Sequence, residues 1–228
     1  WSIYAVMTRM SVNTASNLLG KIGRAIGPRL WLSDRVRENI LHVWPDMPKD
    51  QIEKIVVGVW DNFSRVSNDY WSLDKIRDDR ENRIEIVGAE HLDTLRNSGK
   101  SGILFAGHIG NWEMVTLAAR MHDLPLTVVY RPFNNPLFDA RVRDLQRRSG
   151  VELIMKGREG ARRITQVLKA AGNTIMLVDV RMNDGIKAPF LGVDAMTPSA
   201  PAALSLKYNA LLVPIRVERT GPAHFRVT

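Results

Sequence analysis

Apolar residues recur along this chain with two different spacings, and the change from one to the other divides it into two regions. Up to about residue 80, apolar positions are mostly three or four residues apart, which predicts helices. Beyond it, short apolar runs alternate with helical stretches, as strands and helices do in an α/β layer fold. We therefore predict an N-terminal helical region over 1–80 and an α/β domain over 81–228.

The helical region opens with amphipathic character. Over residues 2–27, apolar side chains interleave with cations, which predicts one or two amphipathic helices. These helices either pack on their own domain or lie in a membrane interface with their cations facing anionic headgroups. Further helices are predicted over about 34–42 and 48–73. The charged run DKIRDDREN that follows predicts a solvated linker and the domain boundary.

Six apolar runs in the second region are predicted strands. They lie at 83–87, 102–107, 126–130, 151–155, 173–179 and 210–217, with helices between them at about 111–121, 136–149, 158–171 and 199–208. The runs at 102–107, 173–179 and 210–217 are continuously apolar, as expected of central strands that are covered on both faces. The predicted fold class is therefore α/β, with a mixed central sheet covered by helices on both faces.

The composition narrows the range of chemistry. A formal net charge of +8 at pH 7 favours acidic partners, such as phosphate-bearing substrates, an anionic membrane surface, an acidic carrier protein or nucleic acid. The chain has no cysteine, which excludes disulfides and thiolate metal sites. Its five histidines are scattered without the spacing of a metal motif, so no metal is expected.

The ends of the sequence indicate a piece of a longer protein. It opens on Trp1 without a recognisable signal peptide and stops at Thr228 inside the strand-like stretch AHFRVT. No run of about 18 apolar residues predicts a transmembrane helix. An anchor in the missing sequence is compatible with this interpretation.

The heptapeptide GHIGNWE, residues 107–113, is the strongest candidate for chemistry. It follows the apolar run SGILFA, so His108 falls where a predicted strand ends, and ligands of open α/β sheets gather at such ends. On a continuous helix, two residues five apart point about 140° away from each other. A sharp turn at Gly110 and a helix cap from Asn111 remove that obstacle. Glu113, in the first helical turn, then reaches back to His108.

A histidine beside a carboxylate is an oriented general base whose charged form is stabilised. Such a dyad can take the proton from an acceptor hydroxyl that attacks a thioester. Backbone N–H groups around Gly107, Gly110 and Asn111 would suit the developing oxyanion. The competing interpretation is structural, with a satisfied histidine, ordinary turn glycines and an acid that complements the helix dipole.

GHIGNWE after an apolar strand resembles the first motif of the bacterial lipid A biosynthesis acyltransferases, within the lysophospholipid acyltransferase superfamily. VVYRPFNNPLFDARVRDLQRRSG, residues 128–150, resembles the family's second block, in which Arg131 follows the strand. Residues 156–219, with Asp179, the NDGI turn, and the PFLG and MTPS loop, resemble the third and fourth blocks. A looser similarity in ENILHVWPDMP and VWDNFSRV extends the resemblance to nearly the whole chain.

The sequence departs from the family pattern in two respects. Members often show DQK where this chain has Asp179, Val180 and Arg181, so the family's middle residue is not kept, although Arg181 keeps a positive charge. Members also usually carry a hydrophobic N-terminal anchor and a tryptophan-rich tail, which these residues lack.

The resemblance implies a glycerolipid acyltransferase-like fold and an O-acyltransferase. A fatty acyl group would pass from acyl carrier protein, or from acyl-CoA, to a hydroxyl of a lipid A precursor at the cytoplasmic face of the bacterial inner membrane. His108 would be the base and Glu113 its orienter, without a covalent acyl-enzyme. No cofactor is expected beyond the acyl donor.

Three arginines and one aspartate are predicted to bind substrate. The guanidinium of Arg131 can fork onto a phosphate or sugar acid, and Arg158 lies near a helix start. Asp179 would position the substrate or hold Arg131 or Arg181, unless it forms a buried structural pair. The cations around 141–163 form either a solvated face or a surface for acidic carrier protein or anionic lipid.

Rival functions stay open. The acceptor could be another glycolipid, such as a mannosylated phosphoinositide, or a lysophospholipid, and the dyad could serve a hydrolase. A non-catalytic basic module that binds membranes or nucleic acid is the alternative from another class. The chain lacks a helix-turn-helix, an RNP motif and the interleaved aromatics of single-strand binders, so nucleic acid is not an expected partner.

Overall fold

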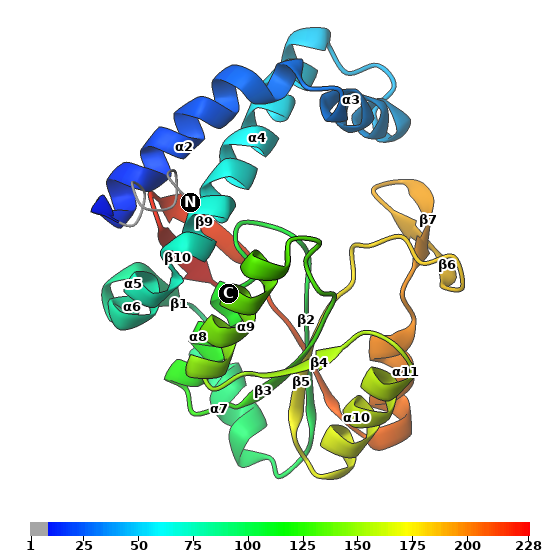
Figure 1. Ribbon diagram of the computed structural model, residues 1–228. Coiled ribbons are helices and arrows are strands. Elements are labelled where there is room, and N and C mark those ends of the chain that lie inside the picture. The colour runs from blue at the N-terminus through cyan, green and yellow to red at the C-terminus, as the bar shows by residue number, and fades with distance from the viewer. Residues whose placement is uncertain (1–8) are drawn as a thin grey trace. The chain divides into compact units, whose positions relative to one another are not determined.

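The structure is a computed structural model in which residues 9–228 are described (Figure 1). The chain divides into two compact units. The first consists of the described residues up to Asp78 together with Pro189–Ala195 and Thr220–His224. The second consists of Asp79–Ala188, Met196–Arg219 and Phe225–Thr228. The division after Asp78 falls inside the charged segment in which the sequence placed a boundary at residue 80.

The first unit is built from helices. They are α2 (Val12–Ile26), the 3₁₀ helix η1 (Gly27–Arg29), α3 (Leu32–Val43), α4 (Lys49–Trp71) and α5 (Leu73–Asp78). The helices predicted over 34–42 and 48–73 are confirmed as α3 and α4. The prediction for residues 2–27 is confirmed by α2 from Val12 onward, and its first seven positions lie outside the described residues.

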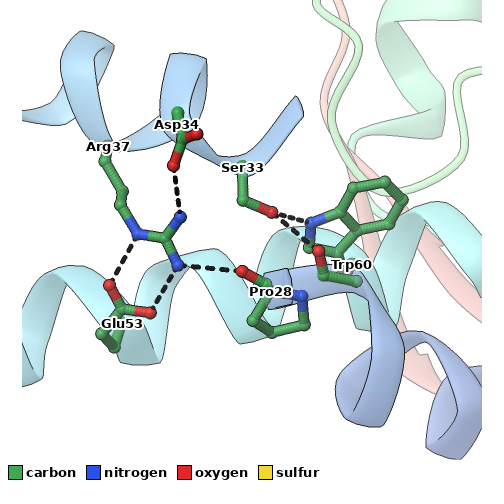
Figure 2. A network of polar contacts seen from close by, with 7 residues as sticks. Pro28, Ser33, Asp34, Arg37, Glu53 and Trp60 are labelled. Atoms are coloured by element: carbon green, nitrogen blue, oxygen red, sulfur yellow. Dashed lines mark hydrogen bonds and ion pairs between the residues drawn. The ribbon is translucent and has the colours of Figure 1, made fainter. Parts of the chain in front are cut away.

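Glycines let α2 and η1 pack closely against α4. A Cβ added at Gly23 would overlap the Ser64 side chain, and one at Gly27 would overlap the Trp60 ring. The indole N–H of Trp60 donates to Ser33 Oγ at 2.8 Å (Figure 2). A larger residue at either glycine would push these helices apart, since the contact leaves no space for a side chain.

An arginine network joins the other helices of this unit. The Arg37 guanidinium of α3 donates to both carboxylate oxygens of Glu53 on α4, at 2.7 and 2.8 Å (Figure 2). It also donates to Asp34 and to the carbonyl of Pro28 in η1, each at 3.0 Å. The hydrogen bond from Arg37 to Glu53, aided by the positive charges of Arg37 and Lys49, holds the pKa of Glu53 below its ordinary value.

The prediction of a solvated linker over DKIRDDREN is wrong. This segment falls largely within two short helices, α5 and α6 (Arg80–Arg83). Leu73 and Ile76 lie three residues apart, so they share one face of α5, and both are buried. Because charged residues surround this apolar pair, the sequence pattern did not predict a packed helix here.

After α6, the chain alternates strands and helices. The strands are β1 (Ile84–Ile86), β2 (Gly102–Ala106), β3 (Leu126–Tyr130), β4 (Glu152–Met155), β5 (Asn173–Leu177), β6 (Ile186–Phe190), β7 (Val193–Thr197), β8 (Leu211–Pro214), β9 (Val217–Gly221) and β10 (His224–Val227). The helices are α7 (Ala89–Asn97), α8 (Met114–Met121), α9 (Pro136–Arg148), α10 (Arg158–Lys169) and α11 (Ala200–Tyr208).

A five-stranded sheet organises the second unit, with the order β4-β3-β5-β2-β8. Its paired strands are parallel wherever their register is defined. Figure 1 shows α7, α8 and α9 on one face and α10 and α11 on the other. Ile103 of β2 is packed with α10 and α11, and its neighbour Leu104 points to the opposite face and is also buried. The predicted α/β class with helices on both faces is confirmed, and the central sheet is parallel in all its pairings rather than mixed.

The sequence missed some elements of the chain after α6. The run predicted as one strand at 210–217 ends as β8 at Pro214, although the N–H of Ile215 still donates to the Phe105 carbonyl of β2 at 2.9 Å, and a separate strand, β9, begins at Val217. β9 joins β1 and β10 in a second, three-stranded sheet. The helix α7 and the hairpin of β6 and β7 were not predicted, because each has few buried apolar positions to reveal a period.

Candidate active site

Strand register places two predicted site residues side by side. β2 and β5 are parallel neighbours in which Ala106 is level with Leu177. The pairing continues one step further, because the N–H of Val178 donates to the Ala106 carbonyl at 3.0 Å. His108 and Asp179 each follow two residues after this level, so both emerge at the carboxyl edge of the sheet, where ligands of such sheets bind.

His108 and Asp179 are joined by two hydrogen bonds. The backbone N–H of His108 donates to Asp179 Oδ2 at 2.6 Å, and the ring atom Nδ1 lies 2.8 Å from Oδ1. An ionised carboxylate only accepts hydrogen bonds, so Nδ1 carries the proton and Nε2 carries the lone pair of the neutral ring. The side chains remain 41% and 35% exposed, respectively. A substrate can therefore reach Nε2.

The sequence left open whether Asp179 holds Arg131 or Arg181, and in the structure its carboxylate instead bonds to His108. Its role in positioning the substrate stays a prediction. The sequence missed this contact because β2 and β5 lie far apart along the chain and become neighbours only in the sheet. One sequence feature could have indicated this contact: each of the two strands is followed, two positions after its end, by a polar residue.

Glu113 lies just before α8 and takes part in another set of contacts. Its carboxylate accepts a hydrogen bond from the side-chain amide of Gln146, on α9. Its backbone N–H donates to Asn111 Oδ1 at 3.1 Å. The carboxylate bonded to Nδ1 of His108 is thus that of Asp179, and the part of Glu113 in the reaction stays a prediction.

The loop between His108 and Glu113 makes the predicted sharp turn. Gly110 has φ +61°, a left-handed conformation, and a Cβ there would overlap the Val217 carbonyl. The predicted cap differs in detail, because α8 begins at Met114, three residues later than expected. Asn111, which is only 1% exposed, instead closes a side-chain turn onto Glu113.

Two further contacts define the surroundings of His108. The Trp112 ring packs edge-on against the His108 ring, with centroids 4.7 Å apart. Trp112 was not among the predicted site residues, although its place within the heptapeptide was a signal. A Cβ at Gly107 would lie 3.2 Å from Asp179 Oδ2, so this glycine leaves space for the carboxylate.

The three predicted arginines lie at the same edge of the sheet. Val128 of β3 is level with Ile175 of β5, so the end of β3, directly before Arg131, is level with the ends of β2 and β5. Arg158 opens α10 after the adjacent β4, and Arg181 follows Asp179 by two residues. All three are exposed, and none of their side chains has a hydrogen bond or ion pair within residues 9–228.

A buried aspartate that the sequence did not reveal fixes the loop after Arg131. Asp139 of α9 accepts the backbone N–H of Phe133 at 2.9 Å and pairs with Arg143 at 2.9 Å. Asn135 caps the same helix by accepting the N–H groups of its first turn. The chain that leaves β3 is therefore held at its second and fourth positions after Arg131.

Within the described residues, no three His, Asp or Glu side chains cluster in a way that would hold a metal ion. The side chains that meet at the carboxyl edge are instead a histidine, a carboxylate that fixes its tautomer, and cations that follow neighbouring strands. Such a set can move a proton and bind an anion.

Comparison with known proteins gives the site a family context. The model of the family described as "Bacterial lipid A biosynthesis acyltransferase" matches residues 2–228. A "Lipid A biosynthesis acyltransferase" of Haemophilus influenzae is 26% identical over 129 residues, which are 54% of this chain and 39% of that protein. A "Phosphatidylinositol mannoside acyltransferase" of Mycolicibacterium smegmatis is 21% identical over 192 residues, which are 80% of this chain and 62% of that protein. The chain thus spans less than two thirds of each curated relative.

Proposed function

Because this chain belongs to the bacterial lipid A biosynthesis acyltransferase family, we propose that it transfers a fatty acyl group from a thioester donor to a glycolipid hydroxyl in lipopolysaccharide biosynthesis. The observation that carries this proposal is the His108–Asp179 pair at the carboxyl edge of the sheet. It supplies an accessible base with a fixed tautomer, which is what direct attack by a hydroxyl requires.

Each step of the reaction can be assigned to groups of this site. Nε2 of His108 takes the proton from the acceptor hydroxyl while its oxygen forms a bond to the thioester carbonyl carbon. Asp179 stabilises the imidazolium that results. When the tetrahedral intermediate collapses, the C–S bond breaks and the imidazolium returns the proton to the departing sulfur. An ester and a free thiol are formed, and no covalent acyl-enzyme is needed.

The developing oxyanion needs hydrogen-bond donors. The proposed donors are the backbone N–H groups of the loop that contains Gly107, Gly110 and Asn111. The N–H of His108 is not among them, because it donates to Asp179. Glu113, which ends this loop, is proposed to hold the loop in its conformation and to set the electrostatic potential beside the His108 ring.

The exposed cations of this protein suggest the chemical nature of its two substrates. Arg131, Arg158 and Arg181 are exposed cations at the same edge as His108, and a guanidinium binds phosphate by paired hydrogen bonds. A phosphorylated lipid A precursor is therefore the proposed acceptor. The proposed donor is acyl carrier protein, because the exposed cations of α9 and α10 would complement an acidic protein. These cations are Arg143, Arg147, Arg148, Arg158, Arg162, Arg163 and Lys169.

A lipid substrate requires access to a bilayer, and α2 carries a suitable face. Its exposed apolar side chains are spaced by four residues, and exposed apolar residues continue through the turn after it to the first residue of α3. The set consists of Leu18, Ile22, Ile26, Leu30, Trp31 and Leu32. We call this set the α2 apolar face. Residues 9–33 carry four cations and no acid, which complements anionic headgroups. Trp31 is 76% exposed, and tryptophan favours the bilayer interface.

The proposed location is therefore the cytoplasmic face of the bacterial inner membrane, with peripheral contact through the α2 apolar face. Among residues 9–228, no helix combines the length and the apolar character needed to span a bilayer.

The decisive experiment compares His108→Ala with wild type and with His42→Ala, using acyl carrier protein as donor and a lipid A precursor as acceptor. His42 is an exposed histidine of α3 and serves as the matched control. We expect His108→Ala to lose transfer by about 10²-fold or more, as the loss of a general base does. Near-wild-type transfer by this variant would remove the proposed base.

A second acceptor has specific support, because the match that covers more of this chain is to the phosphatidylinositol mannoside acyltransferase. The same assay with a phosphatidylinositol mannoside in place of the lipid A precursor tests it. Preferential acylation of that acceptor would favour the second function. Release of free fatty acid without any acceptor would instead indicate a hydrolase.

A further inference from the structure

The cations of α9 and α10 differ in whether acids already pair with them. On α9, Arg143 pairs with Asp139 at 2.9 Å. Arg147 and Arg148 both pair with Asp144, at 3.0 and 2.7 Å. An acidic partner that docked on α9 would have to displace these acids, so the electrostatic gain there is small.

One row of cations on α10 has no such acids. Arg158, Arg162 and Lys169 follow one another at intervals of four and seven residues, so they lie along one side of the helix. All three are exposed, and none forms an ion pair in the part of the chain that the structure describes. We call these three residues the α10 cation row. It is about 16 Å long, because each helical residue adds about 1.5 Å.

α11 lies beside α10 and extends its outer surface. Both helices cover the same face of the sheet (Figure 1). Ile164 and Leu168 of α10 belong to one core cluster, and Leu204 and Tyr208 of α11 pack against it. The sides of the two helices that point away from this cluster therefore form one surface.

The outer side of α11 is apolar. Leu206 is two residues away from both Leu204 and Tyr208, so it lies on the opposite side of the helix, and it is 88% exposed. Ala202 and Ala203, about one turn earlier, are exposed on the same side. An apolar patch beside cations is typical of a protein-binding surface.

Cations of both helices meet near Tyr208. Lys207 Nζ lies 5.5 Å from the centroid of the Tyr208 ring. A hydrogen bond with Thr165, aided by the positive charges of Lys207 and Lys169, holds the pKa of Tyr208 below its ordinary value. Lys169, the last member of the α10 cation row, is therefore close to Lys207.

The α10 cation row begins at the edge of the sheet that carries the reacting pair. Arg158 opens α10 after β4, and three strand spacings separate β4 from β2, the strand that precedes His108. Adjacent strands are about 4.8 Å apart, so this separation is about 14 Å. A thioester on a flexible arm can span it from a carrier that docks beside the row.

We propose that the α10 cation row, together with Leu206 and Lys207 of α11, is the docking surface for acyl carrier protein. This inference rests on the proposed function, in which that protein is the thioester donor. An acidic helix laid along the row would pair with its cations, while apolar side chains of the same helix would cover Leu206.

The first test reverses two charges in Arg162→Glu/Lys169→Glu. We expect KM for the acyl carrier protein donor to rise about tenfold with kcat retained, because like charges now oppose docking. The rise should be confined to this donor, so KM for an acyl-pantetheine donor, which lacks the protein, should change by less than twofold. Equal changes for the two donors would overturn the proposal.

Lys100→Glu/Arg120→Glu is the control for this test. It makes the same change of net charge at two exposed cations outside α10 and α11. An equal rise in KM for this variant would show that net charge, rather than the α10 cation row, determines binding of the carrier. A larger rise for Arg147→Glu/Arg148→Glu than for the α10 variant would place the docking surface on α9, and either result would overturn the proposal.

The second test is Leu206→Ser. Because Leu206 is 88% exposed, we expect an unchanged melting temperature and a rise of about fivefold in KM for the acyl carrier protein donor. Leu137→Ser is the control, since Leu137 is a leucine of α9 that is 65% exposed. Equal KM values for the two variants would remove Leu206 from the docking surface.

The rival occupant of this surface is an anionic bilayer. Sedimentation with vesicles that contain phosphatidylglycerol should give equal binding for wild type and Arg162→Glu/Lys169→Glu. Lost vesicle binding with an unchanged KM for the carrier would assign the row to lipid and overturn the proposal.

Failure of the proposed function is separately visible. It would appear as absence of transfer from either donor in wild type. Calorimetry with acyl carrier protein would still show weaker binding by Arg162→Glu/Lys169→Glu than by wild type. Normal transfer with equal carrier binding by both proteins would instead overturn the docking surface alone.

Discussion

Nδ1 of His108 lies 2.8 Å from Oδ1 of Asp179, and the backbone N–H of His108 lies 2.6 Å from Oδ2. Both oxygens of one carboxylate thus fix one histidine, ring and backbone together. This relationship joins the ends of two adjacent parallel strands, β2 and β5, and leaves Nε2 as the reactive nitrogen.

Replacing Asp179 should impair catalysis without greatly changing substrate binding. In Asp179→Asn, the amide can donate to Nδ1, which favours the tautomer with the proton on Nε2 and removes the base. We expect kcat to fall by about 10²–10⁴-fold. Steady-state kinetics should compare this variant with Asp184→Asn, which changes an exposed aspartate of the NDGI turn. Equal kcat values for the two variants would contradict the role of Asp179.

The turn at Gly110 should tolerate no side chain. Gly110→Ala combines a left-handed φ of +61° with overlap of the Val217 carbonyl, and we expect the free energy of unfolding to fall by about 2–4 kcal/mol. Gly99→Ala is a matched control, because Gly99 has φ +65° and open space around its Cβ position, so only the backbone cost of about 1 kcal/mol applies. Chemical denaturation of both variants measures the difference, and equal losses would show that overlap contributes nothing.

Arg131 should affect binding of the acceptor more than turnover. We expect Arg131→Ala to raise KM for a phosphorylated acceptor by about tenfold, the loss of one charge-assisted contact, with a smaller change for an acceptor without phosphate. Arg120→Ala is the control, since Arg120 is exposed near the far end of α8. If KM rises equally for both acceptors, Arg131 does not bind phosphate.

The Glu53–Arg37 pair should make stability depend on acid pH. The hydrogen bond from Arg37 lowers the pKa of Glu53 below its ordinary value of 4.5, so the folded state binds fewer protons than the unfolded state. The stabilisation is present above pH 4.5 and is lost as pH falls through the lower, folded-state pKa. Glu53→Gln should therefore lower the melting temperature at pH 7, and the difference from wild type should shrink below pH 4.5.

Glu38→Gln controls for general effects of removing an acid, because Glu38 is an exposed residue of the same helix as Arg37. A destabilisation by Glu53→Gln that is independent of pH would indicate lost packing rather than a lost charge.

The α2 apolar face should bind anionic vesicles. We expect the double variant Ile26→Ser/Trp31→Ser to bind vesicles that contain phosphatidylglycerol at least about tenfold more weakly than wild type, since two large apolar groups no longer enter the bilayer interface. Leu206→Ser is the control, because Leu206 is 88% exposed on α11. Sedimentation with vesicles measures binding, and equal binding by both variants would exclude this face.

The sequence indicated most of the second unit because its strands are strongly apolar. The residues 126–130 formed a strand with the predicted bounds, and α9, α10 and α11 differ from their predicted ranges by only one or two residues. Weakly apolar elements such as α7 and the hairpin of β6 and β7 gave no comparable signal, because few of their side chains are buried. The charged helix α5 was missed for a related reason: only two of its six residues are buried.

The features of the candidate site also differ in whether the local sequence indicated them. The sequence by itself determined the local features: a histidine after an apolar strand, a glycine that permits the turn, and an arginine after the next strand. Only the tertiary structure decided which carboxylate meets the histidine. That choice depends on β5 lying beside β2 and on α9 bringing Gln146 to Glu113, and both contacts arise from long-range packing that no local pattern records.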